Sequence, residues 1–472
     1  MLPRLNRNFA RSFILFCISL IALPGYVIGQ STPEESGIVL HKSIEQTAAT
    51  VAAPSSVLST YVDPLQGASS SDLVRRALTL NTELAAARFE VERARGRLRQ
   101  AGLRPNPTAE FEQTTGRLTG SAGERETTIG FALPLDVSGQ RSARINLARA
   151  EFEAVEVGLA DRERRLAAEV RASYAEVMAA IRELEIMENL INVDQQTARV
   201  VEVRVTEGDS SPLELNLLRS EVDRLRARRV LVEGRLQALI LRLKNLVGTA
   251  PGETLRLSEN LDAQILTEPP SVEAAVDIAL RTRPDLRLAR LTEEVAQAGL
   301  RLAHVQGRPD VTAFTRYTDN SAVFDNTPVG VLRDKDRLLT FGVSIGIPVF
   351  NRNQGAKAEA AAAIAQARKR REFAETVVRS EVASAFARYE AAKNSLTIFE
   401  QGVLDRSAQN IRSVRGAYEI GAFRVTDLLV EQRRYIDLQR EFIEAMAERF
   451  RALADLQSAM GIPVIPAQNQ NK

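Results

Sequence analysis

The sequence has little of the chemistry that catalytic and metal sites require. Its 472 residues include no tryptophan, one cysteine and two histidines, and aromatic residues make up only 5%. His41 and His304 are widely separated, and no HExxH, Walker or clustered-cysteine motif occurs. Because tight metal sites, phosphate loops and nucleophilic centres depend on such clusters, we expect no catalytic residue, no resident metal and no cofactor.

A surplus of charge of one sign is also lacking. The chain has 62 Lys and Arg against 60 Asp and Glu, a formal net charge of +2. Three of the positive charges, Arg4, Arg7 and Arg11, lie in a segment that we expect to be removed, which leaves the mature chain near −1. We therefore expect no nucleic-acid partner, since nothing basic remains to attract one.

The N-terminus has the pattern of an export signal. Residues 1–29 contain three arginines, then an apolar core, and end at small residues, which predicts a signal peptide; the alternative is a single N-terminal membrane anchor. Cys17 lies inside the apolar core, so we expect neither a disulfide nor an acylated cysteine in the mature protein. The mixed composition of residues 30–70 predicts an extended or partly ordered N-terminal arm. Export through the signal peptide would make this an arm in the periplasm.

Long apolar runs are missing from the rest of the chain. After Gly29 no run of 18 apolar residues occurs. If the mature chain crosses a bilayer, we therefore expect it to do so with strands closed into a barrel.

The abundant residues are Ala, Arg, Glu and Leu, a composition typical of long helices, and they are arranged in a tandem repeat. Repeat 1, residues 71–248, is echoed by repeat 2, residues 271–463. Pro107, for example, answers Pro309, and both copies have the same order of elements. We infer that one architectural unit was duplicated.

Each copy predicts a helix, two strands, a very long helix, a turn and a return helix. The first helix, Ser71 to Ala101, ends at a pair of prolines. The strands fall at about 108–135 and about 310–349, where residues alternate or run apolar.

The long helix of each copy is longer than a compact domain needs. In copy one it runs from near Ser138 to Gly208 without a proline, about 100 Å at 1.5 Å per residue. In copy two we expect it over about Lys357 to Tyr418. Both end at glycine-containing turns, the tips, at about 206–212 and 418–427, and a flexible tail follows at 464–472.

Four strands cannot close a barrel around a pore. Three chains would supply twelve strands, so the arithmetic permits a trimer. A periplasmic coiled-coil structural protein without a channel would also have such long helices, but it leaves the paired strands unexplained.

Several segments carry a family resemblance. They are Leu103-Arg-Pro-Asn-Pro, Leu133-Pro-Leu-Asp-Val-Ser-Gly-Gln-Arg-Ser-Ala-Arg, Arg308-Pro-Asp-Val, Ile347-Pro-Val-Phe-Asn-Arg-Asn-Gln-Gly-Ala, Tyr418-Glu-Ile-Gly and Thr426-Asp-Leu-Leu. With them, the chain from Ser71 to Pro463 resembles the outer-membrane efflux channels of the TolC family (outer membrane factors). The branch that serves cobalt, zinc, cadmium or copper efflux pumps is the most similar.

The resemblance implies a mostly α fold with a small β part: a tandem-repeat, long-helix α-barrel plus outer-membrane β-barrel strands, four per chain and twelve per trimer. It also implies a homotrimer in outer-membrane lipid, with a helical tunnel in the periplasm. Its partners would be a periplasmic adaptor (membrane fusion protein) and an inner-membrane efflux pump of the RND type. Such a channel is passive and is not an enzyme. We expect heavy-metal cations as its cargo; the alternative is multidrug or small-molecule efflux.

The resemblance also suggests a periplasmic gate at the second tip, where family members place acids that face the lumen. Asp427 falls there and Glu431 is near it, although Val430 stands where relatives carry a second acid. A trimer would bring three such carboxylates together and favour cations. Tyr418 and Arg424 are candidates for bonds that hold the tip closed. Alternatively, Asp427 caps the return helix and Tyr418 packs on its own helix.

The tips are also where a periplasmic partner would meet the channel end-on. The candidates for adaptor contact are Gly208, Ser210, Ser211, Gly421 and Thr426. Their simplest interpretation is turn chemistry, since glycine ends a helix and Ser211, before Pro212, can cap the next one.

Overall fold

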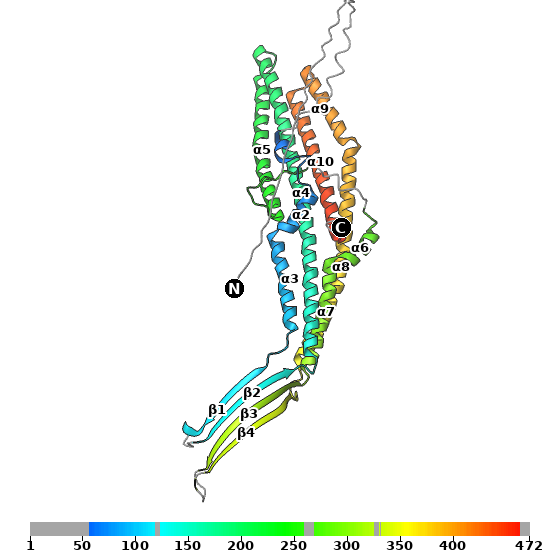
Figure 1. Cartoon of the computed structure of the whole chain (residues 1–472). Helices are drawn as coiled ribbons and strands as arrows, with labels where there is room; N and C mark the ends of the chain where they lie inside the picture. The colour runs from blue at the N-terminus through cyan, green and yellow to red at the C-terminus, as the bar shows by residue number, and fades with distance from the viewer. Residues whose placement is uncertain (1–55, 119–122, 259–268, 325–329, 331, 463–472) are drawn as a thin grey trace, which may run out of the picture. The chain divides into compact units, whose positions relative to one another are not determined.

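The computed structural model describes residues 56–118, 123–258, 269–324, 330 and 332–462. The expected signal peptide, Cys17, His41 and the tail lie outside these residues, as does most of the arm. Within the described residues, the chain forms helices and one four-stranded sheet (Figure 1). The expected fold class, mostly α with a small β part, is confirmed.

The two copies have the same order of elements. A short helix, α1 (Ser56–Tyr61), precedes them. Copy one consists of α2 (Ser70–Leu80), α3 (Thr82–Ala101), β1 (Thr108–Thr115), a 3-10 turn at Gly116–Leu118, β2 (Arg125–Leu135), α4 (Gln140–Glu207) and α5 (Pro212–Val247). Copy two consists of α6 (Val272–Thr282), α7 (Pro284–Gln306), β3 (Asp310–Phe324), β4 (Leu332–Gly346), α8 (Gln354–Ile398), η2 (Phe399–Val403), α9 (Leu404–Glu419) and α10 (Val425–Ala459).

Each opening helix is interrupted once, so the prediction of a single helix from Ser71 to Ala101 is wrong. The backbone of Asn81 is extended, and its Oδ1 accepts a hydrogen bond of 2.9 Å from the Leu84 N–H, which starts α3. In copy two the break falls at Arg283, whose backbone is also extended. Its neighbour Pro284 explains this, because a residue before proline avoids the helical region.

The long helix of copy one is continuous and that of copy two is not. α4 has 68 residues, about 100 Å at 1.5 Å per residue. The predicted helix from Lys357 to Tyr418 is divided by η2, a π turn between α8 and α9. Gly402 in this turn has a φ of 104°, a conformation that glycine adopts without the steric cost of a side chain.

The strands form one antiparallel sheet in the order β1-β2-β3-β4. Ile129 pairs with Phe111 on one side and Tyr317 on the other, and Tyr317 pairs with Leu339. Because side chains alternate along a strand, this register gathers most of the large exposed apolar residues on one face, with Leu338 on the other. Those on the apolar face are Phe111, Ile129, Phe131, Leu133, Leu135, Tyr317, Leu339, Phe341, Val343 and Ile345.

The opposite face of the sheet is more polar. It carries Glu110, whose carboxylate lies 3.9 Å from the Arg316 guanidinium, and the hydroxyls of Thr128 and Thr318, which are 3.2 Å apart. β1 and β4 are the two edges, and neither has a second strand partner among the described residues.

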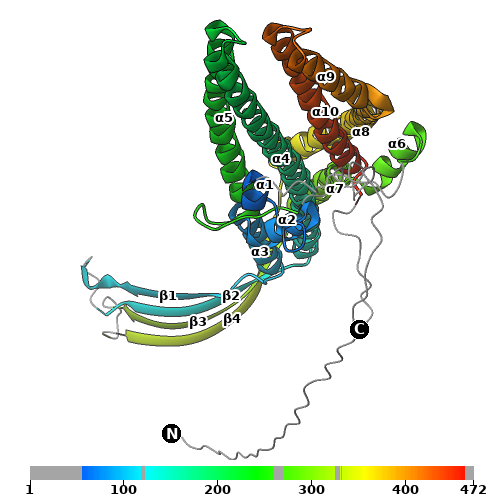
Figure 2. The same cartoon turned by 90° about the horizontal axis from the view of Figure 1, so that it is seen from above.

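α4 is the centre of the helix packing, with α3, α5, α7 and α10 against it. Its predicted apolar stripe is buried from Val170 to Ile191, whereas Leu159 and Leu166 are only half-buried. α4 and α5 form one hairpin, and α9 and α10 form another (Figures 1 and 2). No helix among the described residues has both the length and the apolar character that a membrane crossing requires.

Candidate functional site: the helical tips

The turn between α4 and α5 is held by local hydrogen bonds. Gly208 ends α4 with a φ of 85°, in the left-handed region that glycine tolerates. The Ser211 Oγ accepts a bond of 3.2 Å from the Leu213 N–H and so caps α5, as predicted for a serine before proline. The Ser210 hydroxyl donates to the Glu214 carboxylate at 2.6 Å. These two serines are therefore already engaged in turn chemistry.

The turn between α9 and α10 also contains a left-handed glycine, but its cap is different. Gly421 has a φ of 79°. The Asp427 Oδ2 accepts a hydrogen bond of 3.0 Å from the Arg424 N–H, at the start of α10. Asp427 therefore does cap the return helix, while Arg424, Thr426 and Asp427 all remain exposed.

The two tips lie side by side within one chain. An Arg204 Nη donates to the Glu419 carbonyl at 3.2 Å, which joins the end of α4 to the end of α9. Below the turns, residues from both copies form one buried apolar cluster. Its members are Val201, Leu215, Leu218, Ile411, Tyr418, Val425, Leu428 and Leu429. Each hairpin is thus packed against the other.

Tyr418 belongs to this cluster and is only 7% exposed. Its hydroxyl is buried and has no hydrogen-bond partner among the described residues. Burial raises the pKa of Tyr418, the Glu214 carboxylate raises it further, and Arg204 opposes both. Among the described residues, the ring of Tyr418 therefore packs against its neighbours and its hydroxyl holds no other element by a hydrogen bond.

Glu431 is placed differently from Asp427. It is 9% exposed, and its carboxylate lies 3.4 Å from an Arg434 Nη. Val430, beside it, is 55% exposed. One chain therefore presents a single exposed carboxylate at the start of α10, and Glu431 is turned toward an arginine of its own helix.

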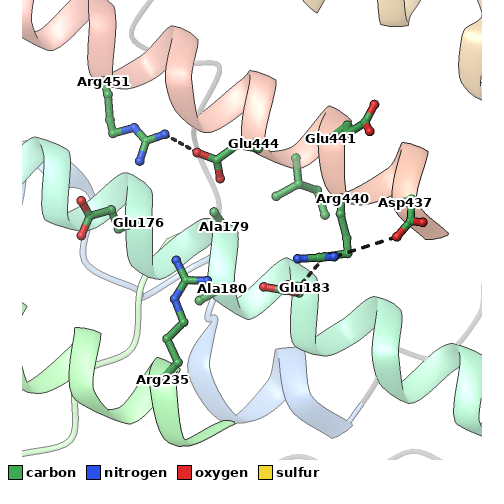
Figure 3. A pocket seen from close by; sticks show the side chains of 11 residues that line it. Glu176, Ala179, Ala180, Glu183, Arg235, Asp437, Arg440, Glu441, Glu444 and Arg451 are labelled. Carbon is green, nitrogen blue, oxygen red and sulfur yellow. Dashed lines mark hydrogen bonds and ion pairs between the residues drawn. The ribbon is translucent and has the colours of Figure 1, made fainter. Parts of the chain in front are cut away.

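A charged pocket of about 510 Å³ lies between α4 and α10, away from the tips (Figure 3). Arg440 donates from its Nε to the Glu183 carboxylate at 2.8 Å and also lies 3.9 Å from Asp437. Arg451 pairs with Glu444 and, at 2.8 Å, with Glu448. These cations are occupied by intramolecular ion pairs, which at a water-exposed surface contribute only about 0–1 kcal/mol each.

No three His, Cys, Asp or Glu side chains among the described residues are grouped so that they could hold a metal ion. His304 lies in the last turn of α7.

The sequence did carry a signal for one polar cluster that its analysis missed. The apolar stripe of α4 continues from Met187 through Ile191 to position 194, which is an aspartate and only 1% exposed. Gln432 of α10 donates a hydrogen bond to this aspartate, and Glu221 of α5 is a like charge that disfavours its ionisation. An acid at an apolar position of a helix is the pattern that would have found it.

The solved structure of CusC is similar to this chain, with a TM-score of 0.70 and 21% identity over 83% of this chain and 92% of that one. Among curated proteins, the cobalt-zinc-cadmium resistance protein CzcC of Cupriavidus metallidurans is 24% identical, over 81% of this chain and 87% of its own. The pyoverdine export outer membrane protein OpmQ of Pseudomonas aeruginosa is also 24% identical, over 82% and 84%.

The family model described as outer membrane efflux protein matches residues 73–249 and 275–462. These two segments lie close to the bounds of the two copies and together cover most of the chain. The chain belongs to the outer membrane efflux protein family.

Proposed function

We propose that this outer-membrane efflux channel is the passive outer component of a tripartite, RND-type system. In this proposal, an inner-membrane pump and a periplasmic adaptor deliver heavy-metal cations to it, and it conducts them to the exterior. It is not an enzyme. The energy for transport is supplied by the pump.

The observation that carries the proposal is the amphipathic sheet with two unpaired edges. The large apolar side chains of Phe131, Tyr317 and Phe341 are exposed on one face, which suits lipid. In a bilayer, however, the backbone groups of β1 and β4 cannot remain unpaired. Pairing β4 of one copy with β1 of the next would satisfy both edges, and three copies would close a barrel of twelve strands.

The tips are the proposed periplasmic entrance. Asp427 is the proposed gate carboxylate because it is exposed, and in a trimer three copies would surround the axis and favour cations. Arg424 beside it, and Tyr418 and Glu431 below, are proposed to hold the entrance in shape. Adaptor contact is proposed at Gly208, Ser210, Ser211, Gly421 and Thr426, which make up the two adjacent turns.

The cargo proposal has a different basis. CzcC is by its name a cobalt-zinc-cadmium resistance protein, which favours metal cations for this chain. OpmQ exports pyoverdine and is equally identical, which favours a second candidate, the export of organic small molecules. Both candidates keep the same channel.

The test of the cargo is the tolerance of a strain from which the gene is deleted, with and without the gene restored. Growth is compared on zinc, cobalt and cadmium salts, and on dyes and antibiotics. Sensitivity to the metals alone, reversed by the restored gene, is the expected result. Sensitivity to dyes and antibiotics alone would overturn the metal cargo and support the second candidate.

The channel itself is tested on the purified protein. We expect a species of three chains in detergent and discrete conductance steps in planar lipid bilayers. A protein that stays monomeric and gives no conductance would overturn the channel, whatever its cargo.

A further inference from the structure

Asp194 and Gln432 form a buried polar contact between α4 and α10. Asp194 is 1% exposed and Gln432 is 4% exposed. The Gln432 Nε2 donates a hydrogen bond of 2.9 Å to the Asp194 Oδ1. Neither residue is in the turns of the tips, and the contact joins copy one to copy two.

Each residue has one buried oxygen without a hydrogen-bond partner among the described residues: Oδ2 of Asp194 and Oε1 of Gln432. Two buried acceptors without donors are costly, and one proton that bridges them would satisfy both. A carboxylic acid and a primary amide pair in a ring: the amide N–H donates to the acid C=O, and the acid O–H donates to the amide C=O. The first of these two bonds is the one already present.

The charged groups that the structure describes around Asp194 neither neutralise its carboxylate nor donate a hydrogen bond to its free oxygen, so they do not take the place of that proton. From α5, Glu221 faces it, but this carboxylate is occupied by Arg224 of its own helix and, at 3.1 Å, by Arg433 of α10. From α9, Arg415 contributes a favourable charge but no hydrogen bond to Asp194 among the described residues. Asp194 therefore has no ion pair of its own in the part of the chain that the structure describes.

A cavity beside this contact gives water access to it, and water can deliver the proton. The cavity has a volume of about 380 Å³ and lies between α4, α9 and α10, and Gln432 forms part of its wall. Asn189, Arg412 and Tyr435 supply further polar groups to the same cavity. A space of this size holds several water molecules at about 30 Å³ each.

We propose that Asp194 and Gln432 form a proton-binding site that fastens α4 to α10 when Asp194 is protonated. The proton comes from water and binds to the Asp194 Oδ2, and the new O–H donates to the Gln432 Oε1. Loss of the proton leaves a buried anion and an unpaired amide oxygen, so the contact between the two hairpins weakens. Acidity would thus tighten the helices below the tips, independently of which cargo passes.

The electrostatics agree with this geometry. Burial raises the pKa of Asp194 to about 6, with a smaller contribution from Glu221 in the same direction, while the Gln432 hydrogen bond and Arg415 lower it. The site therefore changes its protonation between mildly acidic and neutral pH.

The test is infrared difference spectroscopy of the full-length protein in detergent, between about pH 5 and about pH 8, on either side of the Asp194 pKa. As the pH rises, the wild type is expected to lose the C=O stretching band of a protonated carboxylic acid, with a midpoint near pH 6. Asp194→Asn should abolish that band. Its amide keeps the same ring of two hydrogen bonds with Gln432 at every pH, so this variant should fold.

A second variant tests whether the protonated carboxyl of Asp194 is paired with Gln432. Gln432→Glu places two carboxyl groups together, and because like charges disfavour ionisation, the band should persist to a higher pH. Asp437→Asn, which removes an acid of α10 whose side chain is 64% exposed, is the control and should leave the band unchanged. A wild-type spectrum without a band that depends on Asp194, or a band that Gln432→Glu does not shift, would overturn the proposal.

Discussion

The hydroxyl of Tyr418 is buried beneath the tips without a hydrogen-bond partner among the described residues, while its ring packs in the cluster there. An unpaired buried hydroxyl is unfavourable, and a buried ring is favourable. We expect Tyr418→Phe to leave the free energy of unfolding unchanged or to raise it by about 1 kcal/mol. Tyr418→Ala should lower it by about 3–5 kcal/mol. Chemical denaturation of the purified protein measures both.

The same variants separate packing from gating. If the Tyr418 hydroxyl bonds a neighbouring subunit and closes the entrance, Tyr418→Phe would instead destabilise the protein and raise its single-channel conductance. Leu428→Ala is the matched control, since Leu428 is fully buried in the same cluster and has no polar group. It should cost about 2–5 kcal/mol of stability through lost packing alone.

Asp194 should make stability depend on pH in a direction opposite to that of most acids. Its pKa is about 6 in the folded protein and about 3.9 when unfolded. The folded state holds the Asp194 proton more tightly than the unfolded state does, so protonation of Asp194 stabilises the fold. This stabilisation is complete below about pH 4 and is lost as the pH rises through about 6. The difference of about 2 between these two pKa values corresponds to at most about 3 kcal/mol of folding free energy.

This pH dependence is measured as a difference between wild type and Asp194→Asn. The unfolding free energy of the wild type, relative to the variant, should fall by up to about 3 kcal/mol between about pH 4 and about pH 8. Asp437→Asn, matched in chemistry but exposed, should show no such trend. Parallel curves for wild type and Asp194→Asn would contradict the prediction.

At the scale of elements, the break between α8 and α9 contains a glycine in the left-handed region. Gly402 has a φ of 104°. A β-carbon at this position would contact only the Arg406 guanidinium, at 3.4 Å, so the backbone conformation, not a lack of space, is what disfavours a side chain here. We expect Gly402→Ala to lower the unfolding free energy by about 1–2 kcal/mol, the cost of holding an L-residue in the left-handed region.

The matched control for Gly402 is Gly416, which lies inside α9 with a negative φ and open space around its α-carbon. Gly416→Ala should stabilise the protein by about 0.5–1 kcal/mol, because alanine favours helix. The two variants should therefore shift the unfolding midpoint in opposite directions. If both shift it upward, α8 and α9 tolerate a continuous helix across η2, and the break is not enforced by glycine.

The repeat made most of these elements predictable, because each copy supports the assignment of the other. It also held a clue to the break: Glu169 and Glu381 are separated by 212 positions, but Gly208 and Gly421 by 213. One extra residue therefore lies in copy two between these landmarks, a stretch that contains η2. The break at Asn81 has a local signal, because Asn81 caps α3 through the Leu84 N–H. The hydrogen bond from the Asn81 Nδ2 to the Leu246 carbonyl, 165 positions away, has none.

At the tips, the sequence predicted the caps but not the contacts. Ser211 and Asp427 cap their helices through bonds within three residues, and such local chemistry can be read from sequence. The bond from Arg204 to Glu419 and the pairing of Asp194 with Gln432 join the two copies across more than 200 positions. No local pattern specifies such partners, so only the folded chain brings them together.

For the whole molecule, the exposed apolar face of the sheet has the largest consequence. Along β4, Phe341 lies on that face and is 75% exposed, whereas Ser344, three residues on, lies on the other. If the apolar face meets lipid, an arginine there must be buried in hydrocarbon, at a cost of about 2–4 kcal/mol near the middle of the bilayer.

We therefore expect Phe341→Arg to reduce the amount of assembled protein recovered from the outer membrane, and Ser344→Arg to leave it nearly unchanged. Both variants add the same charge to the same strand, three residues apart and on opposite faces. The measurement is the fraction of detergent-extracted protein that migrates as a trimer, together with the amount in the outer-membrane fraction. Equal losses in both variants would mean that the strand tolerates no arginine at all, and the assignment of the lipid face would fail. A loss confined to Ser344→Arg would reverse it, because the polar face would then be the one that meets lipid.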